Sequence, residues 1–282
     1  MMVTVAATPS AAVPIQIREV NTFGIDWSPV RVIIPRLMAS TGFAEVLLSR
    51  PNSLRYCCGM RSRVVYLVDV DNTLLDNDRV VADLMRHLDR TVGQDMQQHY
   101  WTFFNKLRDE LGYADYLGAL QAYRAARPHD LSILKASSFL INYPFANRLF
   151  PNSLDVIDRL KAWGPAVILS DGDIVFQPRK VERSGLQEAV DGRVLIYVHK
   201  ELELEEVERR FPADHYVMVD DKLRLLAAFK SWWGNRVTTV FPKQGHYAHD
   251  PEVLRSYPPA DIAVERIGDL LNVDLSPDTL TR

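Results

Sequence analysis

Short apolar runs that end in polar residues alternate with helical patterns over residues 64–241, and this alternation restricts the fold more than any other feature. The runs VVYLVD, PAVILS, RVLIYV, HYVMVD and RVTTVF begin at positions 64, 165, 193, 215 and 236. Apolar runs of this length are typical of strands that are buried on both faces. Strands that alternate with helices form a parallel sheet. We therefore predict an α/β fold, with a Rossmann-like parallel sheet and helices on both of its faces.

The segment between the first two strands is too long for a single crossover helix. Apolar residues from Val81 to Val92 recur at helical spacing, and similar patterns continue toward Gly164. We predict a helical cap domain over residues 77–164, inserted into an α/β core domain made of residues 61–76 and 165–282.

Residues 1–60 differ from the rest because they contain no lysine, few acids and no sustained hydrophobic period. We expect a poorly ordered N-terminal extension there. Met60 directly precedes the first strand, so the start of the chain is also open to misassignment.

The composition excludes several classes of protein. The formal net charge is −3, which gives no broad attraction to nucleic acid or to a membrane surface. The only cysteines, Cys57 and Cys58, are adjacent, which argues against a disulfide framework or a cysteine-based zinc site. The sequence shows no transmembrane run and no secretory signal, so we expect a cytoplasmic protein. His246 and His249 lie among proline and glycine residues, which indicates a loop.

Polar side chains follow the predicted strands where each strand ends. In an open α/β sheet, ligands bind beyond these carboxyl ends, so the side chains there should converge on one site. The residues are Asp69, Asp71, Thr73, Ser170, Lys200, Asp220 and Asp221.

This combination of side chains suits phosphoryl transfer. Clustered carboxylates repel one another, and a divalent cation such as Mg²⁺ relieves that repulsion through oxygen ligands. A carboxylate can attack phosphorus, and a second acid can protonate the leaving oxygen and then activate water. A lysine and a hydroxyl can hold the phosphoryl oxygens.

These segments resemble the four motifs of the haloacid dehalogenase (HAD) superfamily. DVDNTL at 69–74 resembles the first motif, DxDxT, and VILSDGD, with Ser170, resembles the second. Lys200 resembles the third-motif lysine, and YVMVDDKLRLLAA resembles the fourth motif in its paired-acid form. The resemblance covers residues 64–241, with a helical cap inserted after the first motif.

The resemblance implies a role for each matching residue. Asp69 would be the nucleophile and Asp71 the general acid/base, and Thr73 would stabilise the catalytic loop. Ser170 and Lys200 would bind the phosphate group.

The resemblance also implies a Mg²⁺ site. The ligands would be the Asp69 carboxylate, the Asp71 backbone carbonyl and Asp220. Asp221 would be an alternate ligand or a group behind the ligands.

Two positions depart from the family pattern. Asn72 stands where a glycine is commonest. Lys180 also lies downstream of Ser170 and competes for the third-motif role, but its place in the helix PRKVERSG favours a surface position.

The favoured function is Mg²⁺-dependent hydrolysis of small phosphomonoesters through an aspartyl-phosphate. The alternatives are a phosphomutase or dehalogenase of the same superfamily, or a non-enzymatic phospho-accepting signalling module. A phosphonate-cleaving relative would need a cap lysine, for which Lys106 and Lys135 are candidates.

A helical cap that closes over the site favours a small phosphorylated metabolite as the partner, rather than nucleic acid or a membrane. The identity of the metabolite and the oligomeric state are left open. Arginine and aromatic residues of the cap are candidates for the cleft: His99, Tyr100, Trp101, Arg108, Tyr113, Tyr116, Arg124 and Arg127. Arg124 and Arg127 are the first to test, and the segment PKQGHYAHD is expected to border the site.

Overall fold

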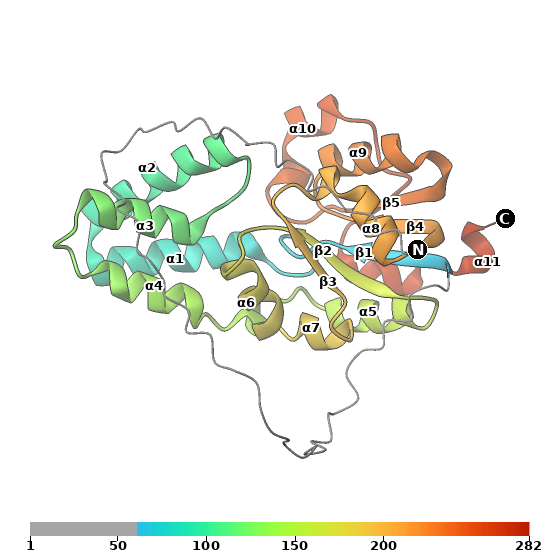
Figure 1. The fold of residues 1–282 in the computed structure, drawn as a ribbon, viewed down its shortest axis with the longest axis horizontal. Helices are drawn as coiled ribbons and strands as arrows, with labels where there is room; N and C mark the ends of the chain where they lie inside the picture. Colours follow the sequence, from blue (N-terminus) through green and yellow to red (C-terminus); the bar gives the residue numbers. More distant parts are fainter. Residues whose placement is uncertain (1–60, 282) are drawn as a thin grey trace, which may run out of the picture. The chain divides into compact units, whose positions relative to one another are not determined.

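The computed structural model describes residues 61–281, and the predictions made for residues 1–60 lie outside this part of the chain. A six-stranded sheet forms its centre, with every neighbouring pair of strands parallel and the order β3-β2-β1-β4-β5-β6 (Figure 1). The strands are β1 (Ser62–Val68), β2 (Ala166–Asp171), β3 (Val194–Tyr197), β4 (Ala213–Val219), β5 (Val237–Pro242) and β6 (Ile262–Val264).

Alternate residues of the strands face two separate apolar cores because side chains of a strand point to opposite faces in turn. On β1, Tyr66 and Val68 belong to one cluster of buried residues, whereas Val65 and Leu67 belong to the other. Both faces of the sheet are therefore buried, as the continuous apolar runs predict.

Helices cover both of these faces of the sheet. The face of Tyr66 packs against α5 (Ser153–Lys161), α6 (Phe176–Arg183), α7 (Leu186–Ala189) and the 3₁₀ helix η5 (Ile267–Asn272). The face of Leu67 packs against α8 (Leu204–Arg210) and α9 (Leu223–Trp233). The remaining short helices are η2 (Lys200–Leu202), η3 (Gly234–Arg236), η4 (Tyr247–His249), α10 (Pro251–Ser256) and α11 (Pro277–Leu280).

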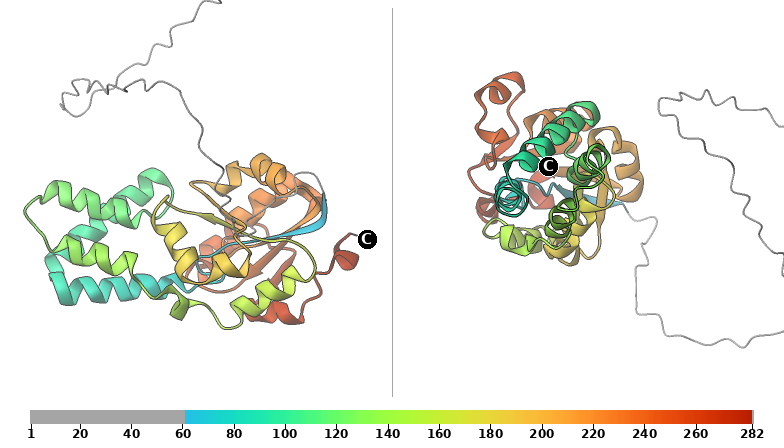
Figure 2. Two further views of the ribbon diagram at one scale, coloured as in Figure 1. Left: turned by 60° about the horizontal axis from the view of Figure 1, so that its bottom comes forward. Right: turned by 90° about the vertical axis from the view of Figure 1, so that its left-hand side faces the viewer.

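A group of four helices follows β1 and lies to one side of the sheet (Figures 1 and 2). Neighbouring helices of this group pack on one another, and the 3₁₀ helix η1 (Phe145–Arg148) leads from it back toward the sheet. The four helices are α1 (Asn77–Val92), α2 (Gln94–Leu111), α3 (Tyr116–Ala126) and α4 (Ile133–Ile141). We refer to α1–α4 as the cap. Helix α5, which the sequence places in the segment 77–164, packs against β2 and η5 at the sheet.

The predicted fold class is confirmed: the sheet is parallel, helices cover both of its faces and helices are inserted after β1. Strand β6 is an addition to the five strands that the apolar runs predict. It pairs with β5 through Ile262, opposite Val240, and is only three residues long. None of the helices in the described part of the chain combines the length and the hydropathy needed to cross a membrane.

Candidate active site

The carboxyl ends of β1, β2 and β4 and the turn after β3 meet at one edge of the sheet. The central strand β1 lies between β2 and β4, so the residues that follow it are flanked by those that follow its neighbours. The parallel topology thus brings together all the residues singled out at the strand ends.

Asp69 and Lys200 form a buried ion pair at the centre of this edge. The Lys200 Nζ atom lies 2.6 Å from Asp69 Oδ1 and 2.7 Å from Asp220 Oδ2, and it donates to the Leu169 carbonyl at 3.1 Å. The backbone N–H of Lys200 donates to Asp171 Oδ1 at 2.8 Å, which holds the start of η2 against the end of β2. Lys200, rather than Lys180, is therefore the lysine that contacts Asp69.

Burial changes the protonation of these groups. Burial alone would lower the pKa of Lys200, but the nearby carboxylates of Asp220 and Asp69 outweigh it and raise that pKa. Burial also raises the pKa of Asp220 to about 6, although Lys200 opposes this change. The pKa of Asp221 is raised well above its usual range by burial, despite the positive charge of Lys222. An additional positive charge would therefore stabilise the ionised carboxylates.

Three buried carboxylates, those of Asp69, Asp220 and Asp221, each offer an oxygen within 4.8 Å of the other two. Among the described residues, Asp69 Oδ2 and both carboxylate oxygens of Asp221 have no hydrogen-bond partner. A buried carboxylate oxygen without a partner is costly unless a cation or water satisfies it. An oxygen-only set of this kind fits a hard divalent cation such as Mg²⁺.

The side chain of Asp71 turns away from this cluster and pairs with Lys180. The Lys180 Nζ atom donates to Asp71 Oδ1 at 2.6 Å and to Oδ2 at 2.8 Å, and it also reaches Asn77 Oδ1 at 3.2 Å. The surface position predicted for Lys180 is wrong: the residue is 0% exposed, because its helix turns this face toward the first-motif loop. Gln177, one turn earlier on α6, donates to Ser170 Oγ at 2.9 Å and to Asp71 Oδ2 at 3.4 Å.

Thr73 and Asn72 shape the loop that carries these acids. The Thr73 hydroxyl accepts a hydrogen bond from the Asp221 N–H at 3.0 Å and so ties the loops after β1 and β4 together. Asn72 has a φ of 60°, the left-handed conformation that glycine and asparagine tolerate best. Its side-chain carbonyl accepts from the N–H groups of Asn77 and Asp78, at the start of α1.

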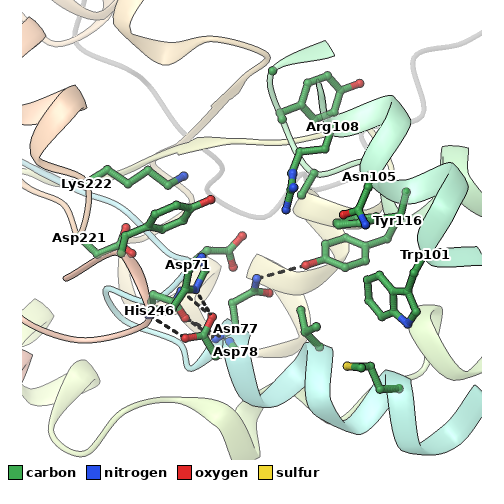
Figure 3. Close-up of a pocket in the computed structure, with 18 residues that line it drawn as sticks. Asp71, Asn77, Asp78, Trp101, Asn105, Arg108, Tyr116, Asp221, Lys222 and His246 are labelled. Carbon is green, nitrogen blue, oxygen red and sulfur yellow. Dashed lines mark hydrogen bonds and ion pairs between the residues drawn. The ribbon is translucent and has the colours of Figure 1, made fainter. Parts of the chain in front are cut away.

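A pocket of about 510 Å³ opens between this edge of the sheet and the cap. Figure 3 shows Asp71, Asp221 and Lys222 on its core side and Trp101, Asn105 and Arg108 on the side of α2. The residues that complete its lining are Asn72, Asn77, Asp78, Val81, Met85, Phe104, Gly112, Tyr113, Ala114, Tyr116, His246 and Tyr247.

The pocket corrects part of the cap prediction. Arg108 lines it, whereas Arg127 pairs with Asp95 elsewhere on the cap and Arg124 is exposed on α3. Lys106 is paired with Glu110 away from the pocket lining. The loop after β5 borders the pocket as expected, since His246 Nδ1 lies 2.7 Å from Asp78 Oδ1 and Tyr247 lines the wall.

No family model and no curated protein matches the sequence, but several solved structures resemble this one. The chain is 61% identical to a protein of Burkholderia xenovorans LB400 that is assigned to the haloacid dehalogenase-like hydrolases; the match covers 76% of this chain and 99% of that chain, with a TM-score of 0.74. The HAD-hydrolase YfnB of Bacillus subtilis, bound to magnesium, is 18% identical over 76% of this chain and 98% of that chain, with a TM-score of 0.52. A dehalogenase is 17% identical over 76% and 96%, with a TM-score of 0.51. At these identities the last two structures show the fold alone.

Proposed function

Because the chain belongs to the haloacid dehalogenase-like hydrolases, we propose that it hydrolyses small phosphomonoesters in a Mg²⁺-dependent reaction. The observation that carries this proposal is a second acid, Asp71, which lines the pocket next to the carboxylate cluster and is held there by Lys180. Removal of a halide needs no proton donor for a leaving oxygen, whereas cleavage of a phosphate ester does. Asp71 therefore favours phosphate chemistry over dehalogenation within this family.

Asp69 is positioned to act as the nucleophile. Its Oδ1 atom is held by Lys200, while Oδ2 has no partner among the described residues and is available to attack phosphorus. Attack forms a bond between Oδ2 and phosphorus and breaks the bond from phosphorus to the leaving oxygen, which takes a proton from Asp71. Asp71 then removes a proton from a water molecule that attacks the aspartyl-phosphate, so that phosphate leaves and both acids return to their initial states.

Ser170 and Lys200 supply the groups that bind the phosphoryl oxygens. The Ser170 hydroxyl is held by Gln177, and the Lys200 ammonium is held by Asp69, Asp220 and the Leu169 carbonyl, so both groups are fixed in place before a substrate arrives. Mg²⁺ would be held by Asp69, Asp220 and Asp221 together with the Asp71 backbone carbonyl, and when bound it would offset the charge of the phosphoryl oxygens.

The size of the pocket supports a small substrate. A volume of about 510 Å³ is in the range of sites for small molecules, and residues of α1 and α2 line part of the pocket. We therefore infer a phosphorylated metabolite as the substrate.

Activity assays with purified protein test this function directly. With Mg²⁺ the protein should release phosphate from 4-nitrophenyl phosphate, and EDTA should abolish this release. Chloride release from a 2-chloro acid, without phosphate release from any ester, would instead assign the protein to the dehalogenases.

The Asp71→Asn variant tests the covalent step. With an activated aryl phosphate the leaving group needs little protonation, so formation of the aspartyl-phosphate should suffer less than its hydrolysis. After a rapid acid quench, peptide mass spectrometry should find phosphate on Asp69. The Asp69→Asn variant should show no phosphate, and phosphate on Ser170 or a histidine would overturn the mechanism.

A further inference from the structure

The two cap helices that line the pocket give it one apolar region. Trp101 and Phe104 of α2 and Val81 and Met85 of α1 all line the pocket, because residues three and four positions apart share one side of a helix. These four side chains carry no charge, so this region suits an apolar part of a ligand.

Two cationic side chains, those of Arg108 and Lys222, also line this pocket. Figure 3 shows the Arg108 side chain extending from α2 and the Lys222 side chain extending from the core, both into the space above Asp71. Arg108 continues the α2 face of Trp101 and Asn105 by successive helical turns, so one helix presents both the apolar and the cationic region.

Neither cation is in a close ion pair with a buried acid within residues 61–281. The acidic partner of Arg108 among these residues is Asp109, at 3.8 Å, and the Asp109 side chain is 75% exposed, which makes this pair weak. Lys222 contacts the ring of Tyr247, and the charges of Asp221, Asp69 and Asp220 raise its pKa from farther away, without a close ion pair.

The acids on the pocket wall already have partners or belong to the metal cluster. Asp71 is paired with Lys180, Asp78 with His246 and Asn72, and Asp221 belongs to the carboxylate cluster. Arg108 and Lys222 are therefore the charges of this pocket that remain for a ligand.

We propose that the substrate combines an apolar body with a second negatively charged group, in addition to the phosphoryl group that is cleaved, and that Arg108 and Lys222 bind this second group. The inference rests on the proposed phosphatase function and specifies its substrate class. A carboxylate and a second phosphate share the required chemistry, since both accept hydrogen bonds from a guanidinium and an ammonium.

Matched aryl phosphates test the inference. 4-Carboxyphenyl phosphate and 4-carbamoylphenyl phosphate have nearly the same size and both withdraw electrons from the ring, but only the first carries a second charge. 1,4-Phenylene bisphosphate replaces the carboxylate by a phosphate. The kcat/KM of the wild-type protein should be higher for a charged probe than for the amide by about tenfold or more. The better of the two charged probes identifies the natural anionic group.

The Arg108→Met variant should reduce this preference to within about twofold, because it removes the charge and keeps an apolar side chain of similar reach. The Arg108→Lys variant should restore part of the preference. Arg124→Met is the matched control, since Arg124 is an exposed cap arginine that does not line the pocket, and it should leave the rates on all probes unchanged.

Two results would overturn the inference while the proposed function stands. One is equal kcat/KM of the wild-type protein for the charged probes and the amide. The other is an equal loss on all probes in Arg108→Met, which would place Arg108 on the phosphoryl group that is cleaved. Failure of the proposed function differs from both, because no probe would then release phosphate with Mg²⁺.

Calorimetry tests the inference even if no probe releases phosphate, because it measures binding alone. The non-hydrolysable pair 4-carboxybenzylphosphonate and 4-carbamoylbenzylphosphonate should differ in Kd by about tenfold or more. Equal Kd values, or no binding of either compound, would overturn the inference without any turnover.

Discussion

The ammonium group of Lys180, which is 0% exposed, donates to both carboxylate oxygens of Asp71, at 2.6 and 2.8 Å. Two hydrogen bonds from one buried donor fix the rotamer of the acid rather than leave it free on its loop. Gln177 adds a contact to the same carboxylate and another to Ser170. Helix α6 thereby positions the proposed general acid, Asp71, and the proposed phosphate-binding hydroxyl of Ser170 together.

Replacement of Lys180 by Met should lower kcat for an aryl phosphate by about tenfold to a hundredfold, because Asp71 loses its partner but keeps its own chemistry. Removal of the acid itself should cost more, about 100- to 10,000-fold. Arg179→Met is the control, since the Arg179 side chain pairs with Glu182 of the same helix and donates to the Ile141 carbonyl rather than to Asp71. Steady-state kinetics and the Tm of each variant check the prediction. An unchanged kcat in a folded Lys180→Met protein would remove Lys180 from the site.

The affinity for Mg²⁺ should depend on pH through Asp220. Burial raises the pKa of this carboxyl to about 6, so below that pH it is protonated and no longer offers an anionic ligand. The Mg²⁺ concentration for half-maximal activity should therefore rise as the pH falls through about 6. Titrations of activity with Mg²⁺ between about pH 5 and about pH 8 measure this change.

Asp221 gives a second measure of the metal site. Both of its carboxylate oxygens lack a partner among residues 61–281, whereas Asp220 Oδ1 accepts from the Lys222 N–H. Asp221→Asn should consequently raise the Mg²⁺ requirement at least as much as Asp220→Asn. A normal requirement in Asp221→Asn would show that Asp221 stands behind the ligands.

The elements around the site were predictable from the sequence to different degrees. The first five strands have long apolar runs, and each is found close to its predicted range. β6 has three residues, too few to show a period, and its place beside β5 depends on tertiary pairing.

The buried face of helix α6 was not predicted, because two of its buried residues, Gln177 and Lys180, are polar. Phe176 and Val181 on that face are the signal that places Lys180 inward, since Lys180 lies one turn after Phe176.

The loop after β5 approaches the first-motif loop closely at Gly245. Its φ is +70°, and a Cβ atom there would lie 2.5 Å from the Cβ of Asn72, whose side chain holds the start of α1. This loop therefore packs against Asn72, the residue next to Asp71. The four motifs do not predict this contact.

Gly245→Ala should lower both stability and activity. Gly192→Ala is a matched control, because Gly192 also has a positive φ, +76°, but has no atom within 4 Å of the added Cβ. Both variants should lose about 1–2 kcal/mol of the free energy of unfolding through backbone strain, and Gly245→Ala should lose more through the contact with Asn72. Urea denaturation measures the free energy, and kcat should fall in Gly245→Ala alone. Equal effects of the two substitutions would mean that Asn72 adjusts without affecting the site.

At the scale of the whole molecule, the two ends of the described chain meet at β1. The Tyr66 hydroxyl on β1 donates to the Leu275 carbonyl at 2.6 Å, and Leu275 is 0% exposed. Arg63 pairs with Asp278 nearby. The sequence shows no motif in this C-terminal segment, and its contribution to the core becomes apparent only when the segment is seen beside β1.

A chain that begins at Met60 should fold and keep its activity, because the sheet, the cap and every site residue lie in residues 61–281.

A chain that ends at Val273 should lose about 2–5 kcal/mol of the free energy of unfolding, since the buried Leu275 is removed. The buried Tyr66 hydroxyl would also lose its acceptor, which adds about 1–3 kcal/mol. Urea denaturation of the two shortened chains beside the full chain measures both effects. If the chain from Met60 is unfolded, the residues before Met60 are needed for the fold. If the chain ending at Val273 is fully stable, the C-terminal segment with Leu275 does not stabilise it.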